Sequence, residues 1–157
     1  MKITMNELTV RFDRRRDDLI KEWRWLVGDT AEPILITSLG DAFLQDEDNS
    51  ISWLDVGGGE YTRVAASPEE FRRIIPDNVD DWFVPQLVGD LLTSGLSIGE
   101  NECFSFKKPP VFGGVYELEN FEATDLTAHF SILGQIYFQA KDLPEGTPIN
   151  QIKVEEP

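Results

Sequence analysis

This 157-residue sequence predicts an α+β fold: an antiparallel β-sheet with helices packed against it, in a single compact domain. Short apolar runs separated by turn residues fill the middle of the chain, and segments on both sides repeat their apolar residues at helical spacing. The length suits one domain, and an apolar content of 41%, with ten phenylalanines and four tryptophans, is enough for a core.

The chain begins with a segment of helical periodicity. Within residues 7–27, Leu19, Trp23 and Val27 fall on one face of a helix. The three arginines at positions 14–16 lie between aspartates at 13, 17 and 18. Opposite charges three or four residues apart, such as Asp13 and Arg16, predict a solvated charged face rather than a nucleic-acid-binding arm.

The next segment changes to strand-like runs. Residues 34–64 predict an antiparallel meander of three or four strands, because the connections are too short for crossover helices. The polar cluster at residues 46–50 and the three glycines at 57–59 are expected to be turns between these strands.

Two helices are expected next. Ser67 can cap the first, Pro68 suits its first helical position, and Glu70 can close a capping box. Pro76 is expected to end this helix at about residue 75. A second helix is expected within residues 80–94, ended by a glycine at position 95.

The last third reads as a strand, a loop and a helix. Residues 102–106 suit a strand, 107–114 a proline- and glycine-rich loop, and 125–140 a helix capped by Thr124. The expected organisation is an N-terminal helical segment over 1–30, an α+β domain over 31–149 and a frayed tail over 150–157.

Charge limits the partners that this chain can have. The net charge is −15; the first 25 residues carry seven basic and five acidic groups, so the excess lies in the rest of the chain. Such a field repels nucleic acids and anionic membranes, and it accelerates encounter with a basic protein. The alternative, that the acidic surface only maintains solubility, remains open.

A cytoplasmic location is expected. The single cysteine excludes an internal disulfide and a thiolate metal cage. No run of residues is apolar enough to span a bilayer, and the early lysine is not followed by the apolar core of a signal peptide.

We expect no catalytic site, cofactor or metal. The acidic run at 46–50 partly resembles a calcium loop, but Ile51 and Gly57 occupy the positions that require glycine and glutamate. Cys103 lies in an apolar strand and His129 in a helical pattern, so both suit the core better than a nucleophilic pair. The three consecutive glycines lack the spacing of a phosphate-binding motif.

Two groups of residues are candidates for binding a protein partner. The first consists of the acidic residues Asp46, Glu47, Asp48, Asp55 and Glu60, and the second of the loop residues Lys107, Lys108, Val111 and Phe112. Acidic side chains suit a basic partner, and apolar side chains on a constrained loop suit an interface. The alternatives are a solvated rim for the first group and a connection packed on the sheet for the second.

Several strings of residues resemble one bacterial family. They lie at 39–43, 46–48, 53–55 and 67–71, and at 106–114 (FKKPPVFGG), 129–136 (HFSILGQI) and 141–147 (KDLPEGT). The family is related to the GAD-like domain, was once catalogued as DUF1851, and is now named for a type VI secretion immunity protein that protects a bacterium from its own DNase toxin.

The resemblance covers roughly residues 30–149 and implies a function by binding. A member would be a cytoplasmic immunity protein that binds and neutralises a secreted toxin, here a type VI secretion DNase effector with a basic surface. The alternative is a non-catalytic binding or regulatory module with an unrelated protein partner. An enzyme of unrecognised type is a third hypothesis, and convergent carboxylates in a deep pocket would favour it.

Overall fold

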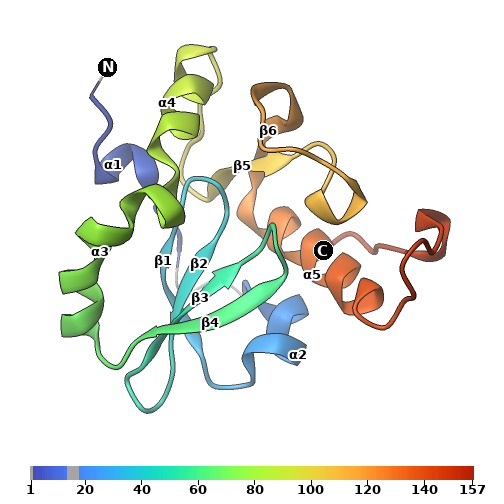
Figure 1. Ribbon diagram of the computed structural model, residues 1–157, viewed down its shortest axis with the longest axis horizontal. Coiled ribbons are helices and arrows are strands. Elements are labelled where there is room, and N and C mark those ends of the chain that lie inside the picture. The colour runs from blue at the N-terminus through green and yellow to red at the C-terminus, as the bar shows by residue number, and fades with distance from the viewer. Residues whose placement is uncertain (1, 14–17) are drawn as a thin grey trace.

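The computed structural model describes residues 2–13 and 18–157 and shows the α+β architecture expected from the sequence (Figure 1). A four-stranded antiparallel sheet has the strand order β1-β2-β3-β4, and a separate pair is formed by β5 and β6. The strands of the larger sheet are β1 (Glu32–Ile36), β2 (Ala42–Gln45), β3 (Ile51–Asp55) and β4 (Glu60–Ala65). The meander predicted over residues 34–64 is therefore confirmed, with sequential strands as neighbours.

Both faces of this sheet are buried along its second strand. Along β2, Ala42, Phe43 and Leu44 are all buried, although successive side chains point to opposite faces. The ring of Phe43 lies 4.9 Å from Phe71 and 5.0 Å from Trp82, so α3 (Pro68–Phe83) covers the face on which Phe43 lies. The helix α4 (Pro85–Thr93) follows α3 directly.

The smaller sheet and the last helix form the other half of the fold. The strand β5 (Glu102–Phe106) pairs in an antiparallel manner with β6 (Phe121–Asp125), and α5 (Leu126–Ala140) follows. The indole N–H of Trp23 donates to the carbonyl of Phe130, 2.9 Å away, which ties the N-terminal segment to α5. Gly134 permits this close packing, because a Cβ there would come within 2.7 Å of the Glu22 carbonyl oxygen.

The prediction of a single helix over residues 7–27 is wrong for the part of that segment that the structure describes. The helix α1 (Met5–Leu8) ends early, and the 3-10 turn η1 (Lys21–Trp23) and α2 (Arg24–Val27) form separately. Between them Thr9 bridges Thr37, and the Val10 N–H donates to the Ile36 carbonyl at 2.9 Å. The Thr9 N–H still donates the last helical bond, to the Met5 carbonyl at 3.1 Å, and pairing with the end of β1 replaces the helical pattern from Val10 onward. The arginines at 14–16 lie outside the described residues.

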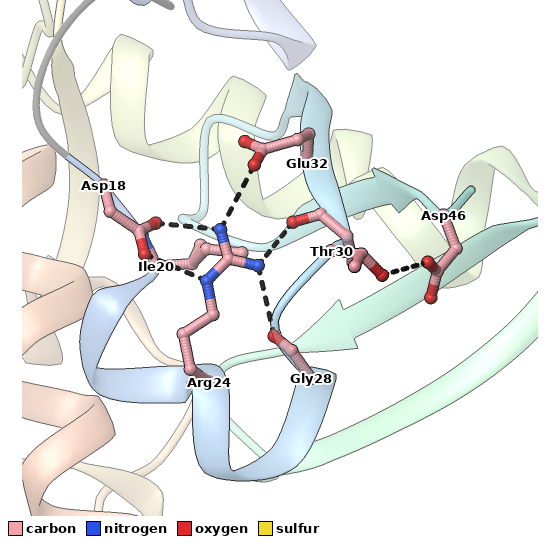
Figure 2. A network of polar contacts seen from close by, with 8 residues as sticks. Asp18, Ile20, Arg24, Gly28, Thr30, Glu32 and Asp46 are labelled. Carbon is pink, nitrogen blue, oxygen red and sulfur yellow. Dashed lines mark hydrogen bonds and ion pairs between the residues drawn. The ribbon is translucent and has the colours of Figure 1, made fainter.

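Arg24 holds the N-terminal segment against the sheet (Figure 2). Its Nε lies 2.9 Å from the Asp18 carboxylate, and one terminal nitrogen lies 3.4 Å from Glu32 at the start of β1. The other donates to the carbonyls of Gly28 and Ala31, at 3.2 and 2.6 Å. One guanidinium group thus pairs with backbone carbonyls at the end of α2 and with carboxylates on both sides, because it carries five N–H donors.

The expectation that Pro76 ends a helix is also wrong. The helix α3 continues through Pro76 to Phe83, and Val84 ends it in a left-handed conformation at φ 46°. Pro76 is exposed, whereas Phe71, Trp82 and Phe83 are buried. Burying a large apolar side chain contributes about 1.5–3 kcal/mol, so three such side chains outweigh an interior proline, which costs about 3 kcal/mol.

The capping predictions are confirmed in part. Ser67 Oγ accepts from the Glu70 N–H at 3.2 Å, but the Glu70 carboxylate accepts from Ala66 rather than from the cap residue. The cap of α5 is Asp125, whose carboxylate accepts from the N–H groups at positions 127 and 128. Thr124, the expected cap, instead pairs with the strand β5 as a residue of β6.

Two further expectations agree with the structure, and one at the C-terminus does not. The strand at 102–106 is confirmed, and Gly95 follows α4 at φ 100° as expected. The expectation of a frayed tail does not fit Lys153 and Glu155. Their N–H and C=O groups form four hydrogen bonds of 2.6–3.0 Å with the side-chain amides of Gln139 and Gln135.

Among the described residues, no helix is both long and apolar enough to cross a membrane.

Candidate partner-binding surface

The segment between β5 and β6, residues 107–120, is a loop with a fixed shape; we call it the 107–120 loop. Asn120 braces it, because its Oδ1 accepts from the Lys108 N–H at 2.8 Å and its Nδ2 donates to the carbonyls of Lys108 and Val115, both at 2.9 Å. The Lys107 N–H also donates to the Asn120 carbonyl, at 2.7 Å. Two short 3-10 turns, η2 (Pro110–Phe112) and η3 (Leu118–Asn120), occupy the span.

This loop exposes apolar side chains. Val111, Val115, Tyr116 and Leu118 are 39, 49, 48 and 37% exposed, whereas Phe112 is half-buried. In the described part of the chain, seven large apolar residues are exposed, and these four lie within eight consecutive positions. Such clustering is unusual, since exposed apolar residues in soluble proteins are normally scattered singly.

Sequence reasoning selected Val111 and Phe112 but missed Val115, Tyr116 and Leu118. The last three follow the glycines of the loop, and no local pattern distinguishes them from core residues. The two lysines predicted as contacts, Lys107 and Lys108, are both exposed at the start of the loop.

Tyr116 connects the loop to the larger sheet. Its ring packs edge-on against Phe106, with centroids 5.3 Å apart, and its hydroxyl lies so close to Gly57 that a Cβ there would come within 2.1 Å of it. Partial burial raises the pKa of Tyr116, and the carboxylates of Asp41 and Asp55 raise it further. The loop therefore lies beside the β3–β4 turn.

A second tyrosine holds the same turn from α5. The Tyr137 hydroxyl donates to the Gly57 carbonyl. Burial raises the pKa of Tyr137 to about 12, and the charges of Asp55 and Glu60 contribute. Gly59 adopts φ 68°, which confirms that the glycine run forms a turn requiring a left-handed conformation.

The five acidic candidates do not form one group. Asp46, Glu47 and Asp48 lie in the β2–β3 turn, whereas Asp55 and Glu60 flank the β3–β4 turn at the other end of β3. A strand of this length separates the two turns by roughly 15 Å.

The acidic side chains in the β2–β3 turn have local partners. Asp46 accepts from the Thr30 hydroxyl at 2.6 Å, and this bond lowers the pKa of Asp46. Asp48 accepts from the Ser50 hydroxyl, which lowers the pKa of Asp48, and lies 3.9 Å from Arg63. The expectation that this acidic run is a hairpin turn is confirmed, since it joins β2 and β3.

Asp41 and Asp55 behave differently because they are partly buried. The Asp41 carboxylate accepts from the Val56 N–H at 3.0 Å. Burial raises the pKa of Asp41 well above its ordinary value, and the charge of Asp55 raises it further. Burial also raises the pKa of Asp55, while hydrogen bonds from the glycine turn oppose this shift. The Asp55 side chain is therefore less accessible to a partner than that of Glu60, which is exposed.

The lone histidine and cysteine lie in the core, as expected. His129 Nε2 lies 2.9 Å from the Gly40 carbonyl and Nδ1 lies 2.7 Å from Ser105 Oγ. A carbonyl only accepts, so Nε2 carries the hydrogen and Nδ1 accepts from the serine hydroxyl. Both side chains are less than 10% exposed. Burial raises the pKa of the Cys103 thiol far above its ordinary value, which disfavours the reactive thiolate.

Among residues 2–13 and 18–157, no group of three or more His, Cys, Asp or Glu side chains is arranged to hold a metal ion.

A family model described as "T6SS immunity protein Tdi1, C-terminal" matches residues 71–137 of this chain. This region is similar to type VI secretion immunity proteins. The match extends from α3 into α5 and contains the whole 107–120 loop. It supports the type VI secretion immunity family expected from the sequence, while the GAD-like and DUF1851 names have no counterpart in it.

No curated protein matches this sequence. Among solved structures, "Crystal structure of Atu4351 from Agrobacterium tumefaciens" is similar at 17% identity and a TM-score of 0.48, over 67% of this chain and 54% of that one. The chain thus spans about half the length of that protein. A likeness at this level carries no functional information.

Proposed function

We propose that this chain is an immunity protein that binds and neutralises a toxin delivered by type VI secretion, and that the toxin is a DNase. The observation that carries the proposal is the match of residues 71–137 to the Tdi1 immunity family. Neutralisation is by stoichiometric binding in the cytoplasm, and the chain itself catalyses no reaction.

The charge of the chain supports a nuclease as partner. A DNase binds a polyanion, so its substrate surface carries lysines and arginines. A protein of net charge −15 is attracted to such a surface and can cover it. Candidate contacts are the acidic residues of the two hairpin turns, from Asp46 to Asp48 and at Asp55 and Glu60, of which Glu47, Asp48 and Glu60 are exposed, together with Lys107, Lys108, Val111 and Phe112 in the loop.

The test is an inhibition titration with the toxin domain of the effector encoded beside its gene. We expect nuclease activity to fall linearly and to reach zero near one equivalent of this protein, and co-expression to protect cells from the toxin. Inhibition at far below one equivalent would indicate an enzyme that modifies the toxin. Absence of both binding and protection would remove the immunity assignment and favour a regulatory module with an unrelated partner.

A further inference from the structure

We infer that the toxin docks on one continuous surface, formed by the 107–120 loop and the β3–β4 turn, with Val115, Tyr116 and Leu118 at its centre. The occupant is a basic protein surface with an apolar depression. The inference rests on the proposed function and deepens it, because it chooses between the two ends of the sheet and adds contacts that the sequence did not indicate.

The first argument is that the loop is already ordered. Asn120 makes three hydrogen bonds across the loop, to both backbone groups of Lys108 and to the Val115 carbonyl. Gly114 lies against the Lys108 carbonyl, where a Cβ would come within 1.7 Å of the oxygen. A loop held in this way loses little conformational entropy on binding, and affinity benefits accordingly.

The second argument is the apolar centre. Val115, Tyr116 and Leu118 are between 37 and 49% exposed. Among the described residues Phe138 on α5 is also exposed, and the Lys141 ammonium lies 4.8 Å from its ring centroid. Apolar and aromatic side chains grouped at one place are typical of the centre of an interface, where most of the binding energy arises.

The third argument is the charge around this centre. Glu117, Glu119 and Glu122 are exposed within or next to the loop, and Glu60 is exposed in the adjacent turn. Only Lys107 and Lys108 oppose them in this region. An apolar centre with an acidic rim complements a basic face, and a rim of this kind mainly directs the approach of the partner.

The fourth argument is continuity. Tyr116 places its hydroxyl over Gly57, and Tyr137 donates to the carbonyl of the same glycine, so the loop and the β3–β4 turn are held together. Figure 1 shows the tip of the β3–β4 hairpin beside the segment that joins β5 and β6. The β2–β3 turn lies at the opposite end of β3, and its Asp46 and Asp48 already bind Thr30 and Ser50.

The experiment measures affinity for the toxin domain, inactivated at its catalytic site, by isothermal titration calorimetry. The double variant Val115→Ser/Leu118→Ser is compared with Met5→Ser/Val154→Ser, whose side chains are exposed to 38 and 39% but lie elsewhere. We expect the loop variant to bind at least about ten-fold more weakly and the control to bind within about two-fold of the wild type.

A second pair of variants tests the choice of turn. Glu60→Lys and Glu47→Lys each reverse one exposed glutamate, in the β3–β4 and β2–β3 turns respectively. We expect Glu60→Lys to weaken binding by about ten-fold at low salt and Glu47→Lys by no more than about two-fold. Thermal denaturation establishes that each variant is folded.

The outcomes separate the two proposals. A wild-type protein that does not bind the toxin overturns the proposed function and the docking surface with it. Wild-type binding that survives Val115→Ser/Leu118→Ser, or that is weakened more by Glu47→Lys than by Glu60→Lys, overturns only the surface. A wild-type dimer that dissociates in the loop variant would assign this face to a second copy of the chain and also overturns the inference.

Discussion

Protonation of His129 should destabilise the fold at mildly acidic pH. The ring is buried and both nitrogens are engaged, with Ser105 Oγ 2.7 Å from Nδ1 and the Gly40 carbonyl 2.9 Å from Nε2. A proton added at Nδ1 would remove the acceptor of the Ser105 hydroxyl and place a positive charge in the core. Burial therefore lowers the pKa of His129 from 6.5 to about 4, with a small opposing contribution from the bond to Gly40.

The sign and size of the effect follow from this pKa. Below pH 6.5 His129 binds a proton in the unfolded chain but not in the folded chain, so stability falls as the pH falls towards 4. The full shift corresponds to about 3 kcal/mol, of which about 2 kcal/mol is lost between pH 7 and pH 5. Asp41 acts in the opposite direction, because its raised pKa favours protonation of the folded state.

The assay is urea denaturation at several pH values between 7 and 5, for the wild type and for His129→Gln. The variant lacks the titrating ring but retains Asp41 and every other carboxylate, so the difference between the two proteins isolates His129. We expect the wild type to lose about 2 kcal/mol more than the variant over this interval.

Parallel stability curves for the two proteins would show that the histidine titrates normally and that its buried hydrogen bonds are not formed. The same conclusion would follow from an NMR titration in the folded state with a pKa near 6.5. The chain has one histidine, so its ring signals need no assignment.

Three further predictions concern packing, the tail and the loop. Gly134→Ala should lower the free energy of unfolding by about 1–3 kcal/mol in urea melts, because the new Cβ would meet a backbone carbonyl. Gly89→Ala should raise the free energy of unfolding by about 0.5–1 kcal/mol, because alanine favours a helix over glycine and the nearest neighbour of its Cβ is 3.4 Å away. Gln139→Ala should accelerate hydrogen exchange at the Lys153 amide, and unchanged protection would contradict the docked tail. Asn120→Asp keeps one acceptor but loses two donated hydrogen bonds, so we expect the free energy of unfolding to fall by about 1–3 kcal/mol. An unchanged melting temperature would contradict the role of Asn120 in bracing the loop.

The parts of the fold that the sequence predicted depend on local chemistry. The meander is encoded by turn residues between short apolar runs, and each strand pairs with its neighbour in the chain. The Ser67 cap and the glycine after α4 act within four residues of their own position. Such features need no knowledge of what packs against them.

The parts that it missed depend on contacts between distant residues. Thr9 and Val10 leave the helical path because strand β1 offers partners about 27 residues away. Pro76 stays within α3 because the buried residues of that helix pack on Phe43, far away in the sequence. The strand β6 contains only two apolar residues, Phe121 and Ala123, and its pairing with β5 defines it.

The candidate surface divides in the same way. Lys107 to Phe112 were visible in the sequence because prolines and glycines mark a constrained loop. The exposure of Val115 and Leu118 was not visible in the sequence, because it depends on the hydrogen bonds by which Asn120 fixes the shape of the 107–120 loop. The acidic residues were visible as composition, but only the strand order places Glu60 beside the loop and Glu47 away from it.

The charge and the loop have separable kinetic consequences. The acidic excess is spread over the chain, so it acts at a distance and should raise the association rate for a basic toxin, an effect that salt screens over about 10 Å. The loop acts only in contact, so Val115→Ser/Leu118→Ser should accelerate dissociation and leave the salt dependence of association unchanged. Stopped-flow kinetics at increasing NaCl measures both quantities. A loop variant whose main defect is slower association would mean that these side chains shape the approach of the partner rather than hold it.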